Sequence, residues 1–202
     1  MTPLVQRIAN LLSPLEGFYA DSGLAIPPVE PLAGERLPEP DRSLLVHDQD
    51  MTSTLESFWN SVLRVRVLGM RRQGDRLNRQ VVLVTDPGER VVEYGAIEID
   101  LAAFDPPARE EIIACVLPLG AILKRHRIDY TCRPGAFFRV AADVITARAF
   151  TIAEGRMLHG RHNLLLDASG RRLAEVVEIL PPTTAATPNP IPRDGRILGS
   201  TS

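Results

Sequence analysis

Two charged residues lie inside apolar segments, where a charge without a partner would destabilise the fold. Arg79 opens the run Arg-Gln-Val-Val-Leu-Val-Thr, and Glu178 lies within Leu-Ala-Glu-Val-Val-Glu-Ile-Leu. Alternate residues of a β-strand share one face, which places each charge among apolar side chains: Val81 and Leu83 beside Arg79, and Val176 and Leu180 beside Glu178. Buried charges need partners. The two residues therefore neutralise each other or other core charges, or they face a polar ligand enclosed by the sheet.

An arginine and a glutamic acid suit a ligand that carries a carboxylate and, at another position, a further oxygen atom. A guanidinium binds a carboxylate through paired hydrogen bonds of fixed geometry, which orients the ligand. A glutamic acid in an apolar pocket has a raised pKa and can give a proton or a hydrogen bond to an oxygen. The alternative is a buried ion pair between Arg79 and Glu178 with no ligand, and such pairs are common in protein cores.

The composition indicates one folded domain with appendages. The chain has 202 residues, and its 45% of hydrophobic residues is enough for a substantial core. A net charge of −2 and a pI near 6.1 lack the basic footprint of a nucleic-acid-binding protein. The basic clusters Arg71-Arg72 and 124–127 are only local. We expect no nucleic-acid partner, and no segment is long and apolar enough to span a membrane.

The sequence offers no support for a metal or an organic cofactor. Cys115 and Cys132 form no metal-type or redox-type pair, and two scattered thiols suit a cytoplasmic protein without disulfides. His159 and His162 are spaced as a helical ligand pair would be, but Gly160 and the adjacent strand argue against a helix there. Phosphate loops, dinucleotide-binding fingerprints and nucleophile elbows are also missing. The N-terminus lacks the pattern of a signal peptide.

The N-terminal part of the chain predicts two helices separated by an arm. Residues 4–15 have the spacing of a short amphipathic helix, whereas 26–40 are too rich in proline for a helix or strand and predict a linker or wrapping arm. A capping box at Ser53-Thr54-Leu55-Glu56 predicts a helix that ends near Trp59, with Met51 just outside its N-terminus.

The rest of the chain alternates strands with short helices. Strands are predicted over 61–69, 79–85, 90–99, 136–140, 162–167 and 172–180, and helices over 107–116 and from Leu119-Gly120 into 124–127. Turn signals at 86–89 and 168–171 predict two antiparallel hairpins. The segment 142–150 fits either a helix or a strand, and the chain beyond Pro182 predicts a disordered tail. The expected fold is an α+β domain with a single antiparallel sheet and helices on one face or at its edge.

Five short motifs occur in a fixed order between residues 44 and 182. They are Leu44-Leu45-Val46 through Asp50-Met51-Thr52, Arg79-Gln80-Val81-Val82-Leu83, Pro118-Leu119-Gly120, Gly160-Arg161, and Glu178-Ile179-Leu180. In order and spacing they resemble the motifs of the chorismate lyase family. The resemblance divides the chain into an N-terminal helix and arm (1–41), a lyase-like domain (42–182) and a tail (183–202).

That resemblance implies a sheet of about six strands with flanking helices and helix-turn-helix flaps that enclose an internal ligand pocket. Members of the family cleave chorismate to 4-hydroxybenzoate and pyruvate, a step of aromatic biosynthesis, without a metal or cofactor. Carried over by motif, Arg79 would bind the ring carboxylate, Glu178 would meet the 4-oxygen, Met51 would line the ring pocket, and Leu119 and Gly120 would present a flap. The expected partner is a small aromatic carboxylate, and the expected state is a monomer or weak dimer.

The chain also departs from the family pattern. Some members carry an arginine in a Gly-Arg-Thr motif, whereas the equivalent stretch here reads Glu93-Tyr94-Gly95-Ala96. Arg161 is then the candidate to hold the second carboxylate of the substrate. Because of this departure two other functions stay open. One is an enzyme of secondary metabolism that acts on a different aromatic or polyketide-like substrate. The other is a non-catalytic binding domain like the effector-binding domains of bacterial transcription regulators, although the N-terminal 40 or so residues are too short for their winged DNA-binding domain.

Overall fold

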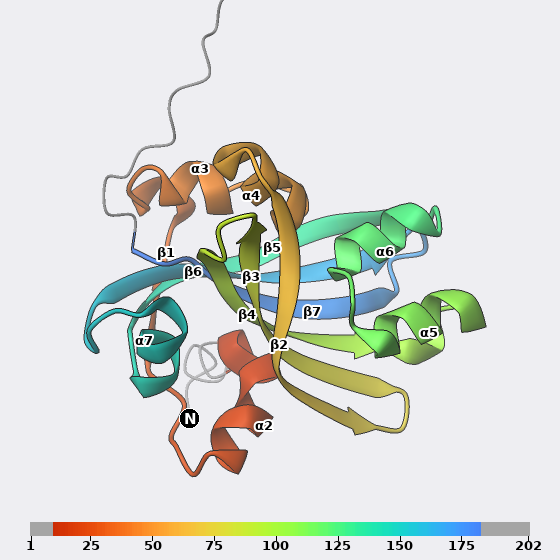
Figure 1. The fold of residues 1–202 in the computed structure, drawn as a ribbon, viewed down its shortest axis with the longest axis horizontal. Helices are drawn as coiled ribbons and strands as arrows, with labels where there is room; N and C mark the ends of the chain where they lie inside the picture. The colour runs from red at the N-terminus through yellow and green to blue at the C-terminus, as the bar shows by residue number, and fades with distance from the viewer. Residues whose placement is uncertain (1–9, 183–202) are drawn as a thin grey trace, which may run out of the picture.

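The structure is a computed structural model that describes residues 10–182. Its seven strands form one antiparallel sheet in the order β1-β5-β6-β7-β4-β3-β2 (Figure 1). The strands are β1 (Val29–Leu32), β2 (Val62–Gln73), β3 (Arg76–Asp86), β4 (Val91–Asp100), β5 (Tyr130–Ala141), β6 (Met157–Asp167) and β7 (Arg172–Ile179). The predicted α+β class and single antiparallel sheet are confirmed, with one strand more than the sequence suggested.

Both predicted hairpins are present, and their registers place the charged residues. The turn at 86–89 joins β3 to β4 so that Arg79 pairs with Ile97 and Leu83 with Glu93. The second turn joins β6 to β7 and pairs Arg161 with Glu178. The strands β2, β5 and β6 extend beyond the predicted ranges because polar and charged residues on their exposed faces also fit a strand.

The helices are short and lie between the strands along the chain. They are η1 (Asn10–Leu12), α2 (Ser13–Asp21), η2 (Gly34–Arg36), α3 (Asp41–Leu45), α4 (Met51–Trp59), η3 (Leu101–Ala103), α5 (Pro106–Ala114), α6 (Leu119–Arg125) and α7 (Val144–Phe150). The predicted helices over 107–116 and from 119 into the basic run are thus confirmed. The ambiguous segment 142–150 is the helix α7, which begins with a capping box between Asp143 and Thr146.

The helix α4 begins earlier than the predicted capping box at Ser53. The N-cap is Asp50, whose carboxylate accepts a hydrogen bond from the backbone N–H of Ser53 at 2.8 Å. Met51 is therefore the first residue of the helix and is not outside it. Aspartate caps a helix at least as well as serine, and Glu56 instead accepts a hydrogen bond from the backbone N–H of Leu63 at 3.0 Å.

The N-terminal arm is also more ordered than its composition indicates. Residues 29–32 form β1, which pairs with β5 at the edge of the sheet, and an edge is where a strand tolerates a proline such as Pro31. The helix predicted over 4–15 lies partly in residues 1–9, outside the described residues, and the described helix α2 begins later, at Ser13. The predicted tail from 183 onward also lies outside the described residues.

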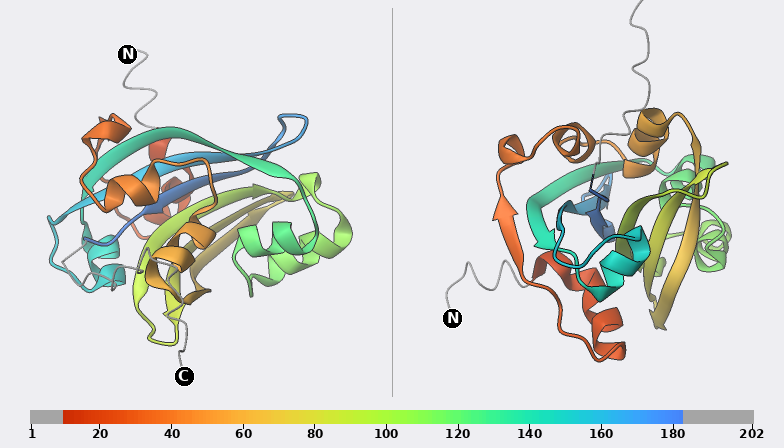
Figure 2. Two further views of the ribbon diagram at one scale, coloured as in Figure 1. Left: turned by 90° about the horizontal axis from the view of Figure 1, so that it is seen from above. Right: turned by 60° about the vertical axis from the view of Figure 1, so that its left-hand side comes forward.

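The helices cover both faces of a strongly curved sheet, which runs from β1 at one side to β2 at the other in the right-hand view of Figure 2. One face packs against α2 and α7 through a core that includes Leu15, Phe18, Val82, Tyr94, Ala147 and Val177. The opposite face carries two separate cores, one with α3 and α4 around Leu45, Leu55 and Leu83, and one with α5 and α6 around Ile99, Ile112 and Ile122. A gap in side-chain packing between these two helix pairs is where the site lies.

Candidate ligand-binding site

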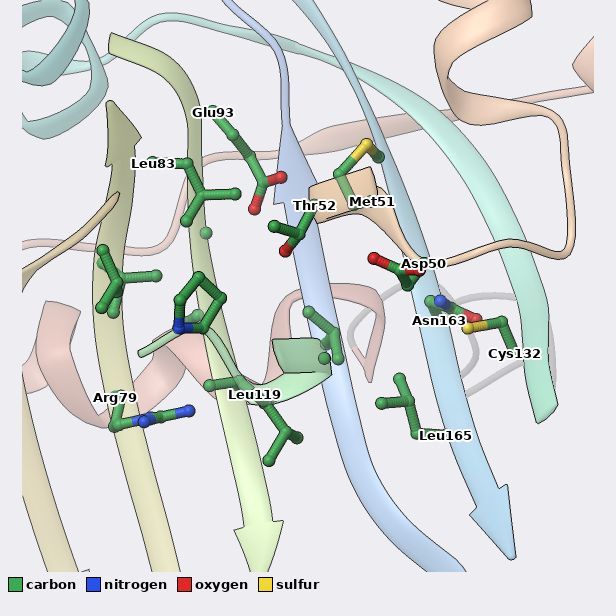
Figure 3. A pocket seen from close by; sticks show the side chains of 18 residues that line it. Asp50, Met51, Thr52, Arg79, Leu83, Glu93, Leu119, Cys132, Asn163 and Leu165 are labelled. Atoms are coloured by element: carbon green, nitrogen blue, oxygen red, sulfur yellow. The ribbon is translucent and has the colours of Figure 1, made fainter. Parts of the chain in front are cut away.

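A cavity lies on the sheet between the first residues of α4 and the first residues of α6 (Figure 3). Its volume is about 80 Å³, small beside the roughly 300–1,000 Å³ of sites for drug-sized ligands. The helix residues that line it are Asp50, Met51, Thr52, Pro118, Leu119 and Gly120, and the strand residues are Val65, Arg79, Val81, Leu83, Glu93, Gly95, Ala96, Ile97, Cys132, Asn163, Leu165 and Val176. The lining is mostly apolar, with a few polar groups at separate positions.

The strand registers explain how distant residues reach this one surface. One row across the sheet consists of Arg79, Ile97, Val176 and Asn163, and the next row consists of Val81, Gly95, Glu178 and Arg161. Gly95 stands in the middle of the second row, where a Cβ atom would lie 2.5 Å from the backbone oxygen of Val177. The sheet therefore has no side chain at that point, and the space above it belongs to the cavity.

Arg79 lies in the cavity wall and lacks a carboxylate partner. Its side chain is 2% exposed, and one terminal nitrogen donates to the backbone oxygen of Ile112 at 3.3 Å and contacts Cys115 Sγ at 3.0 Å. Its Nε has no partner, and none of the carboxylates in residues 10–182 forms an ion pair with it. Burial lowers the pKa of the Arg79 guanidinium, an effect that Cys115 opposes. The sequence-based expectation that Arg79 sits on an apolar strand face is confirmed.

Glu93 is a second buried group in the cavity that lacks a full set of partners. It is 5% exposed, and no residue of the described part of the chain forms a hydrogen bond with its Oε2 atom. Burial raises the pKa of Glu93 well above its usual range, the nearby Glu178 raises it further, and Arg161 opposes the shift. Burial therefore favours the protonated, neutral form of Glu93, and in that form the carboxyl can donate a hydrogen bond.

Glu178 is paired with Arg161, one of the alternatives that the sequence left open. Arg161 is 0% exposed, and its Nε donates to Glu178 Oε2. The terminal nitrogens donate to the backbone oxygens of Leu45, His47 and Gln49 at 3.1–3.3 Å. Burial by itself would lower the pKa of Arg161, but Glu178 raises it overall. The pair thus connects the sheet to the segment that leads into α4.

The structure brings most of the sequence-derived site residues together. Arg79, Met51, Leu119 and Gly120 line the cavity. Glu178 shares the cavity face of β7 with Val176, but it and Arg161 bond to each other beside the cavity and are not part of its lining. Glu175 points to the other face, where it contacts Ser13 and His162.

Two buried polar residues of the cavity lining, Glu93 and Asn163, were not among the predicted site residues. Glu93 lies in the apolar run Val-Val-Glu-Tyr-Gly-Ala-Ile, so the period-two pattern that singled out Arg79 would also have singled out this residue. Asn163 is 1% exposed, and its Oδ1 has no hydrogen-bond partner. It carries no charge, and its place in the row with Arg79 depends on the pairing of four strands.

Comparisons with known proteins identify the fold alone. No family model and no curated protein matches the sequence. Among solved structures, PhnF from Mycobacterium smegmatis matches 67% of this chain at 12% identity with a TM-score of 0.54, and the chain covers 65% of PhnF. The separate effector domain of PhnF is covered to 87%, at 11% identity with a TM-score of 0.51 over 65% of this chain. A GntR-family transcriptional regulator from Bacillus cereus has 9% identity and a TM-score of only 0.44, with 64% of this chain and 98% of that chain covered.

In residues 10–182 no helix has the length and hydropathy needed to cross a membrane.

The Arg161–Glu178 pair predicts a strong energetic coupling. Replacing one partner of a buried ion pair leaves the other charge uncompensated, so Glu178→Gln should lower the free energy of unfolding by about 3–5 kcal/mol. The double variant Arg161→Met/Glu178→Gln should lose less than the sum of the single variants, by on the order of 2 kcal/mol. Urea denaturation of the four proteins measures this coupling. Glu175→Gln, on the opposite face and partly solvated, should lose clearly less than Glu178→Gln, and an equal loss would contradict the assigned role of the pair.

The raised pKa of Glu93 predicts how the free energy of unfolding changes with pH. An acid whose pKa is raised by folding holds its proton in the folded state at pH values where the unfolded chain has lost it. The contribution of Glu93 to the free energy of unfolding is therefore complete below about pH 4.3, the pKa of a glutamate in the unfolded chain. It declines as the pH rises toward the pKa of Glu93 in the folded state, by up to about 1.4 kcal/mol per pH unit. Urea denaturation at pH 5, 6 and 7 should show wild type losing stability relative to Glu93→Gln. Parallel curves for the two proteins would mean that Glu93 is already ionised.

Proposed function

We propose that this domain binds a small, single-ring aromatic carboxylate, in the manner of an effector domain and without catalysis. The observation that carries the proposal is Arg79, a guanidinium buried in a cavity wall that no carboxylate of residues 10–182 neutralises. A buried charge of this kind is unfavourable unless it is compensated. A ligand carboxylate would neutralise the charge of Arg79 and would accept two parallel hydrogen bonds from its guanidinium.

The remainder of the cavity supports this choice of ligand. Its surface is mostly apolar, which suits an aromatic ring, and a volume of about 80 Å³ favours one ring over a polyketide-like molecule. We assign Met51 to contact with the ring, and Leu119 and Gly120 to the flap formed by the start of α6. The fold shared with the effector domain of PhnF agrees with a binding role but does not by itself establish one.

Binding without chemistry accounts better for Glu178 and Arg161 than a lyase does. Chorismate carries two carboxylates, so a lyase site needs a cation for each. Arg161, the sequence-based candidate for the second carboxylate, donates to Glu178 and to three backbone oxygens. Glu178 in turn holds the charge of Arg161 and would have to leave this pair before it could assist a departing oxygen.

A chorismate lyase-like activity is the second candidate function. It is favoured by the position of Glu178 on the strand face whose neighbour Val176 lines the cavity. In that function Arg79 and Glu178 would be the catalytic residues, and Arg161 would contact the second carboxylate. The elimination aromatises the ring, so positioning of chorismate by these charges would supply much of the rate enhancement.

Arg79→Met tests the proposed binding function. Loss of a charge-assisted hydrogen bond to a buried carboxylate should weaken binding of 4-hydroxybenzoate about a hundredfold. Because the variant also removes an uncompensated buried charge, the ligand-free protein should become more stable, by roughly 1 kcal/mol or more. Isothermal titration calorimetry and thermal denaturation measure the two effects. Arg76→Met, an exposed change on the same strand, is the control for both, and unchanged affinity in Arg79→Met would remove Arg79 from the site.

An assay with chorismate separates the two candidate functions. The wild-type protein is incubated with chorismate, and pyruvate and 4-hydroxybenzoate are measured against a sample without protein. We expect no release above that background, together with measurable binding of 4-hydroxybenzoate. If pyruvate is released, Glu178→Gln should slow it by roughly 10²–10⁴-fold while Glu175→Gln has little effect, and the enzyme function would replace the binding function.

A further inference from the structure

Two buried polar groups, Arg79 and Glu93, lie far apart in the same cavity. In the paired strands β3 and β4, Arg79 is opposite Ile97 and Glu93 is opposite Leu83. The two positions are four residues apart along the strands, or about 13 Å. Figure 3 shows the side chains of Arg79 and Glu93 well separated. The floor between them includes Gly95, which leaves the space open.

At the end of the cavity near Glu93, the described residues supply no cation that a second ligand carboxylate could use. Arg161 is the nearby cation, and its guanidinium is bonded to Glu178 and to backbone oxygens. Glu93, Glu178 and Arg161 interact electrostatically as one group. With Glu93 protonated, that group has no net charge, whereas a second ligand carboxylate would add a buried negative charge without a partner.

Glu93 itself lacks a partner on the cavity side. Its Oε2 atom is buried and makes no hydrogen bond with any of the residues that the structure describes. A protonated carboxyl is a hydrogen-bond donor, and a buried donor without an acceptor is unfavourable. An uncharged oxygen of a ligand, such as a hydroxyl, ether or carbonyl oxygen, would supply the acceptor.

We propose that Glu93 determines ligand specificity by donating a hydrogen bond to an uncharged oxygen at the end of the ligand remote from the carboxylate that Arg79 binds. This inference rests on the proposed binding function and narrows it. The ligand class is a ring monocarboxylate with a distal hydroxyl, ether or carbonyl oxygen, and dicarboxylates are rejected. Glu93 thereby selects ligands both by the charge of their distal group and by its ability to accept a hydrogen bond.

Three benzoic acids that differ only in the substituent opposite the carboxylate test this specificity by isothermal titration calorimetry at neutral pH. They are benzoate, 4-hydroxybenzoate and benzene-1,4-dicarboxylate. Wild-type protein should bind 4-hydroxybenzoate about tenfold more tightly than benzoate, the value of one hydrogen bond, and should bind the dicarboxylate more weakly than either. Equal affinity for the first two acids, or the tightest binding for the dicarboxylate, would overturn the assignment of Glu93.

Two variants at one position show whether the selectivity resides in Glu93. Glu93→Gln keeps a neutral donor of the same shape and should keep the preference for 4-hydroxybenzoate. Glu93→Leu lacks the donor and should bind benzoate and 4-hydroxybenzoate equally well. A preference that survives in Glu93→Leu would assign the selectivity to another residue.

The same titrations distinguish failure of this inference from failure of the proposed function. If benzoate binds and Arg79→Met weakens it while Glu93→Leu leaves the preference unchanged, only the role of Glu93 is wrong. If none of the three acids binds to wild type, both proposals are wrong. Infrared spectra give an independent readout: the carboxylic C=O band of Glu93 should be present at neutral pH, be missing in Glu93→Gln, and shift when 4-hydroxybenzoate binds. Absence of that band from the wild-type spectrum would also overturn the proposal.

Discussion

The geometry of the cavity depends on a single buried guanidinium. Arg161 extends from the middle of the sheet, neutralises Glu178 on the neighbouring strand and donates to the backbone oxygens of Leu45, His47 and Gln49. Leu45 is the last residue of α3, and His47 and Gln49 belong to the segment that leads into α4, so these contacts hold the connection between the two helices against the sheet. Met51 and Thr52, in the first turn of α4, therefore reach the cavity because an ion pair beneath them is satisfied. Removal of one charge would leave its partner buried and the segment without its anchor.

Arg79 is a buried arginine like Arg161, but its charge is not neutralised by a carboxylate of the described residues. A carboxylate and three backbone oxygens compensate the charge of Arg161. Arg79 has one backbone oxygen and a thiol as partners, and its Nε has none among residues 10–182. The ligand-free fold tolerates this charge because the surrounding cores compensate for it elsewhere. Sites that are strained or incompletely bonded in the free state are characteristic of function, since a ligand then binds the folded state and stabilises it.

The sequence predicted the parts of this protein that depend on local patterns. The hairpins followed from turn residues and period-two runs, and the position of Arg79 on the cavity face followed from the same periodicity. The partner of Glu178 did not, because the contact with Arg161 depends on the register between β6 and β7 and not on any local signal. The edge strand β1 was missed since proline content argues against a strand unless the strand is known to lie at an edge. The helix α4 was predicted to begin at the capping-box pattern of Ser53, and its N-cap is Asp50, three residues earlier.

The position of β7 has a consequence for how the chain is made. This strand is the last one along the sequence of residues 10–182, yet it lies between β6 and β4 in the centre of the sheet. During synthesis on the ribosome, β3 can pair with β2 and β4, and β5 can pair with β1 and β6. The two groups have no shared sheet edge until residues 172–179 emerge. Until then the nascent chain exposes the open edges of β4 and β6, which are sites of unwanted pairing with other chains. The strand that brings Glu178 to Arg161 is thus also the one that joins the two halves, so that assembly of the cavity coincides with the end of folding.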